Sequence, residues 1–223
     1  MGLPAPYYKD DLVTLYHGDC VQLLPEIAGG GLEMTLVTDP PYGMAYASNN
    51  GKPWRGVAIA GDDSLDARDT VLAIWGDMPA LVFGTWKIDR PEGCRNLLIW
   101  DKGGSPGAGD LSMPWGFSHE EIYVLGKGFA GRRGGSVLTF PPKNNRNGSD
   151  IRFHPTEKPT KLMGALIAKC PGVIVDPFAG SGSTLRAAKD LGRKAIGIEL
   201  DEGYCKTAAD RLGQEVLDFG SAA

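Results

Sequence analysis

A strand–turn–helix–strand pattern over residues 173–199 constrains the fold of this 223-residue chain more than any other feature. The apolar run 173–176 predicts a buried strand, and the glycine-rich segment 177–184 leads into a predicted helix. A second apolar run, 195–199, predicts another strand, which ends in Glu199. Glycines in such a turn let a ligand approach the backbone near a helix N-terminus, and an acid after the next strand can hydrogen-bond ribose hydroxyls. The pattern therefore predicts half of a Rossmann-type nucleotide site in an α/β fold.

The class of nucleotide is narrowed by what this turn lacks. A dinucleotide fingerprint would place a third glycine three residues after Gly182, where the chain has Leu185. The Gly-Lys-Ser/Thr sequence of a phosphate-binding loop is also absent. A nucleoside cofactor without a pyrophosphate fits these residues better, and S-adenosylmethionine is the candidate.

A second constrained stretch, Thr38-Asp39-Pro40-Pro41-Tyr42-Gly43, follows the apolar run 34–37. Two consecutive prolines exclude a helix and further strand pairing, so the chain must leave the sheet in a stiff turn. Ligand sites of open α/β sheets gather at this carboxyl edge. A rigid surface turn without function is the simpler interpretation. The preceding strand, the acid at its end and the later nucleotide motif favour a site.

The side chains of this turn suit attack by the exocyclic amine of a nucleobase. Such an amine is a poor nucleophile, because its lone pair is delocalised into the ring. Asp39 can accept one amine hydrogen, and a backbone carbonyl of Pro40 or Pro41 can accept the other, which favours a localised lone pair. The ring of Tyr42 offers a face on which an extruded base can stack, an interaction worth about 1–3 kcal/mol.

Apolar patterning along the rest of the chain predicts one domain over residues 1–223, with a mostly parallel twisted sheet and helices on both faces. Residues 1–11 are predicted to be a loose lead-in, and the long segment 43–62 is expected to be a loop of the kind that acts as a lid. Further strands are expected at 13–16, 80–83, 96–100 and 121–125, and further helices at 21–27, 66–75 and 160–170.

Residues 126–153 have weak apolar periodicity and frequent glycine and asparagine, and they are predicted to be a short insertion. The chain has a net charge of −4, yet residues 129–161 carry seven basic and two acidic side chains. One interpretation is a solvated charged loop, and the other is a patch that follows DNA phosphates. The candidate DNA-binding residues are Arg132, Arg133, Lys143, Arg146 and Arg152.

Cysteine and histidine usage excludes several classes of site. The four cysteines lie far apart and are expected to be reduced thiols of a cytoplasmic protein. The three histidines lack zinc-ligand spacing, so no metal site is expected. No apolar run approaches the roughly 20 residues that span a membrane, and the first residues show no signal pattern.

Together these motifs resemble the amino-group DNA methyltransferases of the β arrangement, a circularly permuted order in which the catalytic turn precedes the cofactor loop. The resemblance covers nearly the whole chain. It implies that the insertion at 126–153 recognises the DNA target, and the shortness of that insertion is the main departure from the family. It implies a Rossmann-like methyltransferase fold and S-adenosylmethionine as cofactor. It assigns catalysis to Asp39, Pro40, Pro41 and Tyr42. It assigns cofactor binding to Asp19, Cys20, His154, Thr156, Lys158, Asp176, Phe178, Gly180, Ser181, Gly182, Thr184 and Glu199. From the residues alone, the segment 154–159 is equally well read as a plain loop.

The resemblance further implies site-specific methylation of double-stranded DNA. Aspartate before Pro-Pro-Tyr favours adenine N6 as the target, and cytosine N4 is the alternative. A homodimer and a separate restriction endonuclease are left open as partners. The rival hypotheses are a non-catalytic DNA-binding subunit, against which the intact motifs argue, and a nicotinamide-dependent dehydrogenase, against which Leu185 argues.

Overall fold

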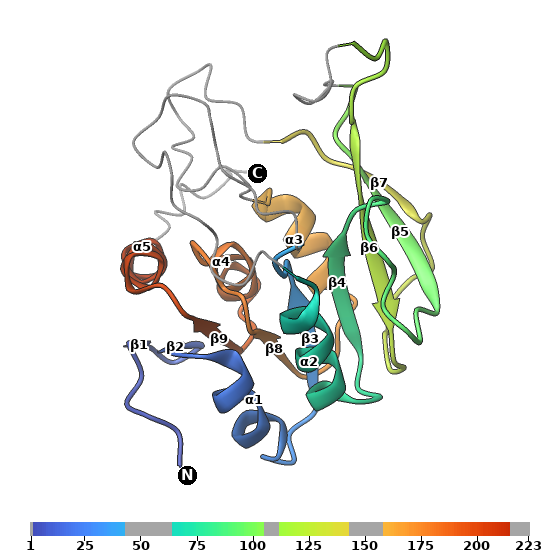
Figure 1. Ribbon diagram of the computed structural model, residues 1–223. Helices are drawn as coiled ribbons and strands as arrows, with labels where there is room; N and C mark the ends of the chain where they lie inside the picture. The colour runs from blue at the N-terminus through green and yellow to red at the C-terminus, as the bar shows by residue number, and fades with distance from the viewer. Residues whose placement is uncertain (1, 43–63, 105–111, 143–157, 215–223) are drawn as a thin grey trace.

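The computed structural model describes residues 2–42, 64–104, 112–142 and 158–214 and builds them around one sheet (Figure 1). In this sheet the described strands follow the order β1-β2-β9-β8-β3-β4-β6-β5-β7. The strands are β1 (Tyr8–Lys9), β2 (Val13–His17), β3 (Met34–Thr38), β4 (Ala80–Gly84), β5 (Asn96–Asp101), β6 (His119–Leu125), β7 (Val137–Thr139), β8 (Val173–Asp176) and β9 (Ala195–Glu199). The helices are α1 (Cys20–Ala28), α2 (Asp66–Trp75), α3 (Thr160–Ile167), α4 (Ser183–Asp190) and α5 (Glu202–Gly213).

Most neighbouring strands of this sheet run parallel, as predicted. β2, β9, β8, β3 and β4 form a continuous parallel block, whereas β6 runs antiparallel to both β4 and β5. We call the edge at which the strands of this block end the carboxyl edge, and the other the amino edge. β5 also ends at the carboxyl edge and β6 begins there, because β6 runs against its neighbours.

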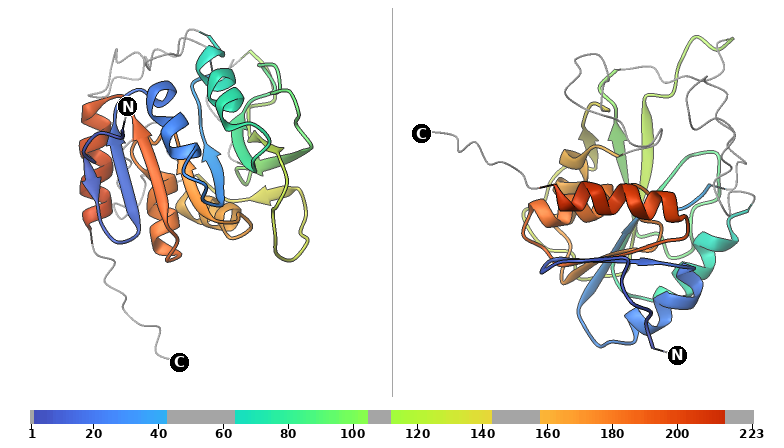
Figure 2. Two further views of the ribbon diagram at one scale, coloured as in Figure 1. Left: turned by 90° about the horizontal axis from the view of Figure 1, so that it is seen from below. Right: turned by 90° about the vertical axis from the view of Figure 1, so that its left-hand side faces the viewer.

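Helices cover both faces of the sheet, also as predicted (Figure 2). Neighbouring residues of one strand point to opposite faces, so Val37 packs with α3, α4 and α5, whereas Leu36 packs with α1 and α2. Ile174 and Val175 divide between the two cores in the same way. Central strands buried on both faces read as unbroken apolar runs, which is why β3, β4 and β8 were recognisable in the sequence.

Three described elements were not predicted. β1 lies within the expected lead-in and pairs antiparallel with β2, and β7 lies within the expected insertion and extends the sheet beside β5. Helix α5 follows the last motif, and the side chain of Asp201 caps it by accepting a hydrogen bond from the backbone N–H of Tyr204. The predicted lid at 43–62 lies outside the described residues. In the described part of the chain, no helix is long and apolar enough to span a bilayer.

The parallel pairing of β3 with β8 sets the geometry of the carboxyl edge. Met34 lies opposite Val173 and Leu36 opposite Val175, so the two strands end side by side. Beyond the last pair, the hydroxyl of Thr38 donates a 2.7 Å hydrogen bond to Oδ1 of Asp176, and both groups are buried. The two motifs singled out in the sequence therefore leave the sheet next to each other, although more than 130 residues separate them.

At the amino edge, Gly172 allows β8 to begin against β3. Its φ is +62°, and a Cβ at this position would overlap the carbonyl group of Glu33. That carbonyl accepts the hydrogen bond from the backbone N–H of Val173, the first residue of β8. The close approach of the two backbones therefore requires glycine here.

Replacing Gly172 by alanine should destabilise the protein more than replacing Gly31, which has a similar φ of +69° but open space around its Cα. Gly31→Ala carries only the backbone penalty of about 1 kcal/mol. Gly172→Ala adds a backbone overlap and should cost about 3 kcal/mol. Urea denaturation of the two variants measures the difference. Equal losses of unfolding free energy would show that β3 and β8 do not approach closely at this point.

Candidate active site

The catalytic carboxylate predicted from the sequence lies directly after β3, on a half-buried turn. Oδ1 of Asp39 accepts a 2.5 Å hydrogen bond from the hydroxyl of Tyr42. Burial, together with the nearby charge of Asp39, raises the pKa of Tyr42 well above its ordinary value. Tyr42 is therefore a neutral donor at any physiological pH, and its ring is held beside the carboxylate.

Lys158 contacts the second oxygen of the same carboxylate. Its Nζ lies 2.6 Å from Oδ2 of Asp39 and 3.1 Å from Oε2 of Glu120, and the side chain is buried. Oε1 of Glu120 in turn pairs with Nζ of Lys102 at 2.7 Å. Two carboxylates and two ammonium groups thus alternate in a row that starts at the catalytic turn.

Aromatic rings form the floor under this row of charges. Nζ of Lys158 lies 4.9 Å from the ring centroid of Phe83 in β4, and Nζ of Lys102 lies 5.0 Å from that of Trp100 in β5. Burial alone would lower the pKa of Lys158, but Asp39 and Glu120 raise it above its ordinary value. Burial would likewise raise the pKa of Glu120, but Lys158 and Lys102 lower it. Lys158 and Glu120 are consequently both ionised near neutral pH.

Asp176, at the end of β8, is a buried carboxylate of a different kind. It accepts hydrogen bonds from the hydroxyls of Thr38 and Thr184 and from the backbone N–H of Phe178. Burial raises its pKa to about 6, which these hydrogen bonds only partly offset. Among the described residues no ion pair to Asp176 is formed, and a buried carboxylate is costly unless a cation compensates it.

The glycine-rich turn between β8 and α4 has the backbone expected for close ligand approach. Gly180 has φ of +50° and open space where a Cβ would stand, and Gly182, the N-cap of α4, has φ of +78°. Glu199 ends the adjacent strand β9, and its carboxylate accepts hydrogen bonds from the backbone N–H of Gly180 at 2.7 Å and of Asp201 at 2.8 Å. Each carboxylate oxygen retains a further acceptor position.

The remaining predicted cofactor residues extend this line of groups along the carboxyl edge. Asp19 follows β2, which pairs with β9 so that His17 lies opposite Glu199. The side chain of Asp19 caps α1 by accepting a hydrogen bond from the backbone N–H of Val21, and Cys20 is buried in the core. The half-buried Phe178 and the buried Ser181 and Thr184 lie in or next to the turn that follows β8.

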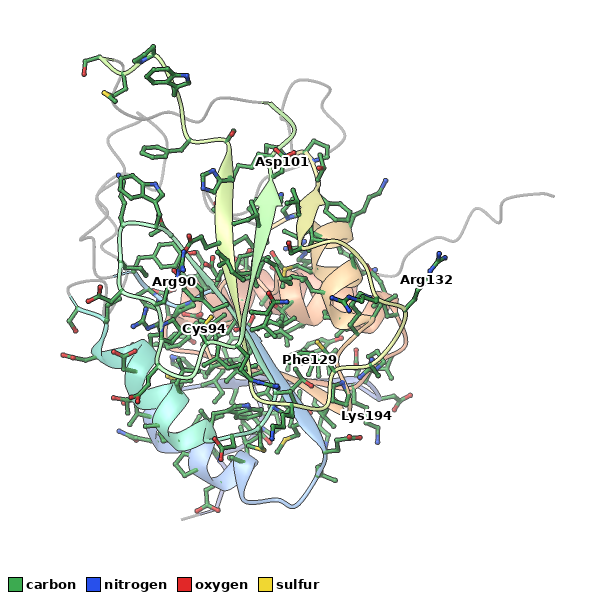
Figure 3. All side chains as sticks on the ribbon, turned by 90° about the vertical axis from the view of Figure 1, so that its right-hand side faces the viewer. Arg90, Cys94, Asp101, Phe129, Arg132 and Lys194 are labelled. Atoms are coloured by element: carbon green, nitrogen blue, oxygen red, sulfur yellow. The ribbon has the colours of Figure 1, made fainter. Side chains whose placement is uncertain are left out.

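The predicted DNA-binding arginines lie elsewhere. Arg132 and Arg133 belong to the segment that joins the end of β6 to the start of β7, and both of these strand ends lie at the amino edge. The carbonyl of Arg132 accepts a hydrogen bond from Lys169, which follows α3, whereas Lys158 precedes that helix. Figure 3 shows Arg132 projecting sideways, well below Asp101, which marks the carboxyl edge. The structure therefore does not bring this pair close to Asp39.

Five predicted site residues lie outside the described residues. They are His154 and Thr156, predicted for the cofactor, and Lys143, Arg146 and Arg152, predicted for DNA. Conversely, sequence reasoning missed Glu120 and Lys102. The available signal for Glu120 was a pair of consecutive acids at the start of an apolar run. Neighbouring residues of a strand point to opposite faces of the sheet, and both faces are covered, so neither acid can be fully exposed there. Nothing in the local sequence marked Lys102.

These groups fit S-adenosylmethionine. The methionine part of that molecule carries an ammonium group that suits the uncompensated carboxylate of Asp176, and its ribose carries hydroxyls that suit Glu199. The open Cα of Gly180 leaves room for a ligand against the backbone between them. With the cofactor held in this way, the order β9, β8, β3 would place its methionine end towards Asp39.

Comparison with known proteins agrees with this chemistry. The sequence profile of the N6/N4 methyltransferase family, described as DNA methylase, matches residues 66–210. A putative methylase, YubD, of Escherichia coli K12 is 31% identical over 225 residues, which cover 92% of this chain and 93% of that protein.

Two solved structures share the fold. The M1.HpyAVI–SAM complex superposes with a TM-score of 0.64 at 20% sequence identity. The match covers 91% of this chain and 100% of the M1.HpyAVI chain. The cytosine-N4-specific PvuII DNA methyltransferase superposes with a TM-score of 0.67 at 17% identity and covers 94% and 89%. With the profile match and the 31% identical relative, the acidic turn and the glycine-rich loop at one sheet edge show that this chain belongs to the N6/N4 family of DNA methylases, which are S-adenosylmethionine-dependent methyltransferases.

Proposed function

We propose that this enzyme methylates the N6 amine of adenine at a specific site in double-stranded DNA. The observation that carries the proposal is the position of Asp39, at the end of β3 and directly beside the end of β8, where Asp176 and the glycine-rich turn lie. Aspartate rather than serine before Pro-Pro-Tyr supports adenine, through the family resemblance. Cytosine N4 is the second candidate, because the PvuII DNA methyltransferase, which shares the fold, is cytosine-N4-specific.

The residues of the catalytic turn orient the amine. In this proposal the target base leaves the duplex, at a cost of a few kcal/mol, and stacks on the ring of Tyr42. The carboxylate of Asp39 accepts one amine hydrogen, and the carbonyl of Pro40 or Pro41 accepts the other, which localises the nitrogen lone pair. Asp39 need not be a strong base, because the nitrogen loses its proton readily after it has been methylated. Alignment of the nitrogen with the methyl group supplies most of the catalysis.

The residues after β8 and β9 hold the cofactor. S-adenosylmethionine supplies an electrophilic methyl group on its sulfonium sulfur. Asp176 binds its ammonium group, Glu199 its ribose, and the segment at Asp19 and Cys20 its adenine. The other residues proposed for cofactor contact are His154, Thr156, Phe178, Gly180, Ser181, Gly182 and Thr184. Lys158 was also expected to contact the cofactor, but its ammonium group pairs with Asp39 and Glu120.

Double-stranded DNA is the proposed macromolecular partner, and the prokaryotic cytoplasm, where DNA is accessible, is the proposed place of action. Contact of DNA with Arg132 and Arg133 stays a prediction. Because these residues lie towards the amino edge, they would have to follow phosphates at some distance from the flipped base.

The function is tested by the modified nucleosides in DNA from cells that express either the wild-type protein or the Asp39→Ala variant. Mass spectrometry should detect N6-methyladenine with the wild-type protein, and the variant should reduce it by at least about a hundredfold. The exposed Asp77, on the loop between α2 and β4, provides the matched control Asp77→Ala, which should methylate normally.

Calorimetry should show that Asp39→Ala binds S-adenosylmethionine as tightly as the wild-type protein, because the altered group faces the base. N4-methylcytosine in place of N6-methyladenine would establish the second candidate. Normal turnover by Asp39→Ala would remove Asp39 from the proposed role, and an absence of cofactor binding by the wild-type protein would support the inert-subunit hypothesis.

Cofactor affinity should depend on pH through Asp176. Its pKa of about 6 in the folded protein lies above the ordinary value of 3.8, so the carboxylate gains a proton as the pH falls through 6. The protonated form cannot pair with an ammonium group. The dissociation constant of S-adenosylmethionine should therefore rise about tenfold between pH 7 and pH 5. Asp176→Asn should bind weakly with little pH dependence over the same range, and a pH-independent wild-type affinity would exclude the pairing.

A further inference from the structure

Lys158 was expected to bind the cofactor, but its ammonium group contacts two carboxylates and two aromatic rings around the turn that holds Asp39. Its ammonium group lies 2.6 Å from Asp39 and only 5% of the residue is exposed. Asp39 is the first residue past β3, and Lys158 immediately precedes Pro159, the N-cap of α3. The ion pair therefore joins the end of the central strand to the start of a helix 119 residues later.

A catalytic aspartate on a turn needs contacts that hold its carboxylate in one orientation. Rotation about its Cβ–Cγ bond is soft, and alignment errors of about 1 Å in an active site can reduce the rate a hundredfold. The Tyr42 hydroxyl engages Oδ1, and the Lys158 ammonium engages Oδ2. Contacts on both oxygens fix the plane of the carboxylate, and each oxygen keeps a lone pair for the amine hydrogen.

Glu120 completes the arrangement. A single buried ammonium group 2.6 Å away would offset the negative charge that Asp39 presents to the developing positive charge on the amine nitrogen. Oε2 of Glu120 lies 3.1 Å from the same ammonium group, and within the described part of the chain this buried oxygen makes no hydrogen bond. With Glu120 sharing the lysine, Asp39, Lys158 and Glu120 together carry one negative charge, which Lys102 balances from the other oxygen of Glu120, 2.7 Å away.

We propose that Lys158, balanced by Glu120, is a positioning residue that fixes the carboxylate of Asp39 for attack by the amine, an inference that rests on the role proposed for Asp39. It predicts a loss of turnover, and not of cofactor affinity, when the lysine is neutralised. The cofactor-binding role first expected for Lys158 predicts the reverse.

The test compares Lys158→Met, Glu120→Gln and the double variant by kcat and by the dissociation constant of S-adenosylmethionine. Lys158→Met should lower kcat about a hundredfold and leave the cofactor dissociation constant within about twofold. Glu120→Gln should lower kcat less and add little in the Lys158→Met background, because it acts through the lysine. Lys158→Arg should recover part of the lost kcat, since it retains the positive charge.

The double variant also guards against simple misfolding. Lys158→Met alone leaves a buried carboxylate short of a partner, whereas removing both charges relieves that cost. The double variant should therefore unfold at a temperature closer to that of the wild-type protein, yet its kcat should remain low. Wild-type kcat in a folded double variant, or selective loss of cofactor binding in Lys158→Met, would overturn the proposal.

A second readout needs no turnover and separates failure of this inference from failure of the proposed function. Acylation of lysines, read by mass spectrometry, should spare Lys158 in the wild-type protein and label it in Asp39→Ala, whereas the exposed Lys161 should label equally in both. Equal labelling of Lys158 and Lys161 in the wild-type protein would show that the lysine is not held by Asp39, whether or not DNA is methylated.

A different observation supports a DNA-contact surface at the same edge. The loop after β4 and the loop before β6 leave the sheet together, because Gly84 lies opposite Glu121. The rings of Trp86 and Phe117 lie 5.8 Å apart, and Nζ of Lys87 lies 4.7 Å from the Phe117 centroid. Trp86 is 58% exposed. In the segment before β6, Met113 is 56% exposed and Trp115 is 78% exposed.

These residues are joined closely to the catalytic turn. The carbonyl of Thr85, next to Trp86, accepts a hydrogen bond from the hydroxyl of Tyr123, and Phe83, two residues earlier, lies under Lys158. A cluster of exposed aromatic rings with a cation suits unstacked bases and their phosphates. We infer that Trp86, Lys87, Met113, Trp115 and Phe117, here called the aromatic edge, contact the DNA beside the flipped base.

The aromatic edge is tested by the affinity of the catalytically silent Asp39→Ala protein for a fluorescent duplex, so that binding is read without methylation. Adding Trp115→Ala should weaken binding about tenfold, and Lys87→Ala should reduce the salt dependence of binding by about one phosphate contact. Leu32→Ala is the control, because Leu32 is 60% exposed but precedes β3 at the amino edge. Equal effects of Trp115→Ala and Leu32→Ala would overturn the assignment.

Discussion

The whole site depends on the parallel pairing of β3 with β8. These strands are the third and eighth along the chain, yet they lie together at the centre of the sheet, and Gly172 lets their backbones approach. The pairing brings two carboxylates to one edge, and the Thr38 hydroxyl bridges towards Asp176. Without this register, the acidic turn and the glycine-rich loop would be separate surface features with no common chemistry.

Concentrating charge at one edge carries a cost that the fold itself does not require. Asp39, Glu120, Lys158 and Asp176 are all wholly or partly withdrawn from water, and replacing buried ionic groups with apolar residues is often neutral or stabilising. Lys158 and Glu120 compensate each other, whereas the described residues offer Asp176 only neutral donors. A ligand with a positive charge would relieve that imbalance, which is why the edge is better explained by catalysis than by stability.

The sequence was sufficient for features encoded locally. Asp39, Gly180 and Glu199 each stand directly after an apolar run or in a glycine-rich turn, so spacing alone placed them at strand ends. Contacts between distant segments were beyond it. The family resemblance assigned Lys158 to the cofactor, and nothing in the local sequence reveals that its side chain contacts Asp39, 119 residues earlier. Arg132 and Arg133 were chosen by counting charges along the sequence, and such a count does not show on which side of the molecule the side chains lie. β1 and β7 are too short for a periodic pattern, since two or three residues complete barely one alternation.

In the proposed complex, one edge of the sheet holds the cofactor between Glu199 and Asp176, with its methyl end towards Asp39. A crystal structure of the protein with the unreactive cofactor analogue sinefungin tests this most directly. We expect the ribose beside Glu199, the amino group of the amino-acid part within hydrogen-bond distance of Asp176, and the transferable position facing Asp39. An analogue bound at another edge, or reversed so that its adenine lies against Asp39, would contradict it.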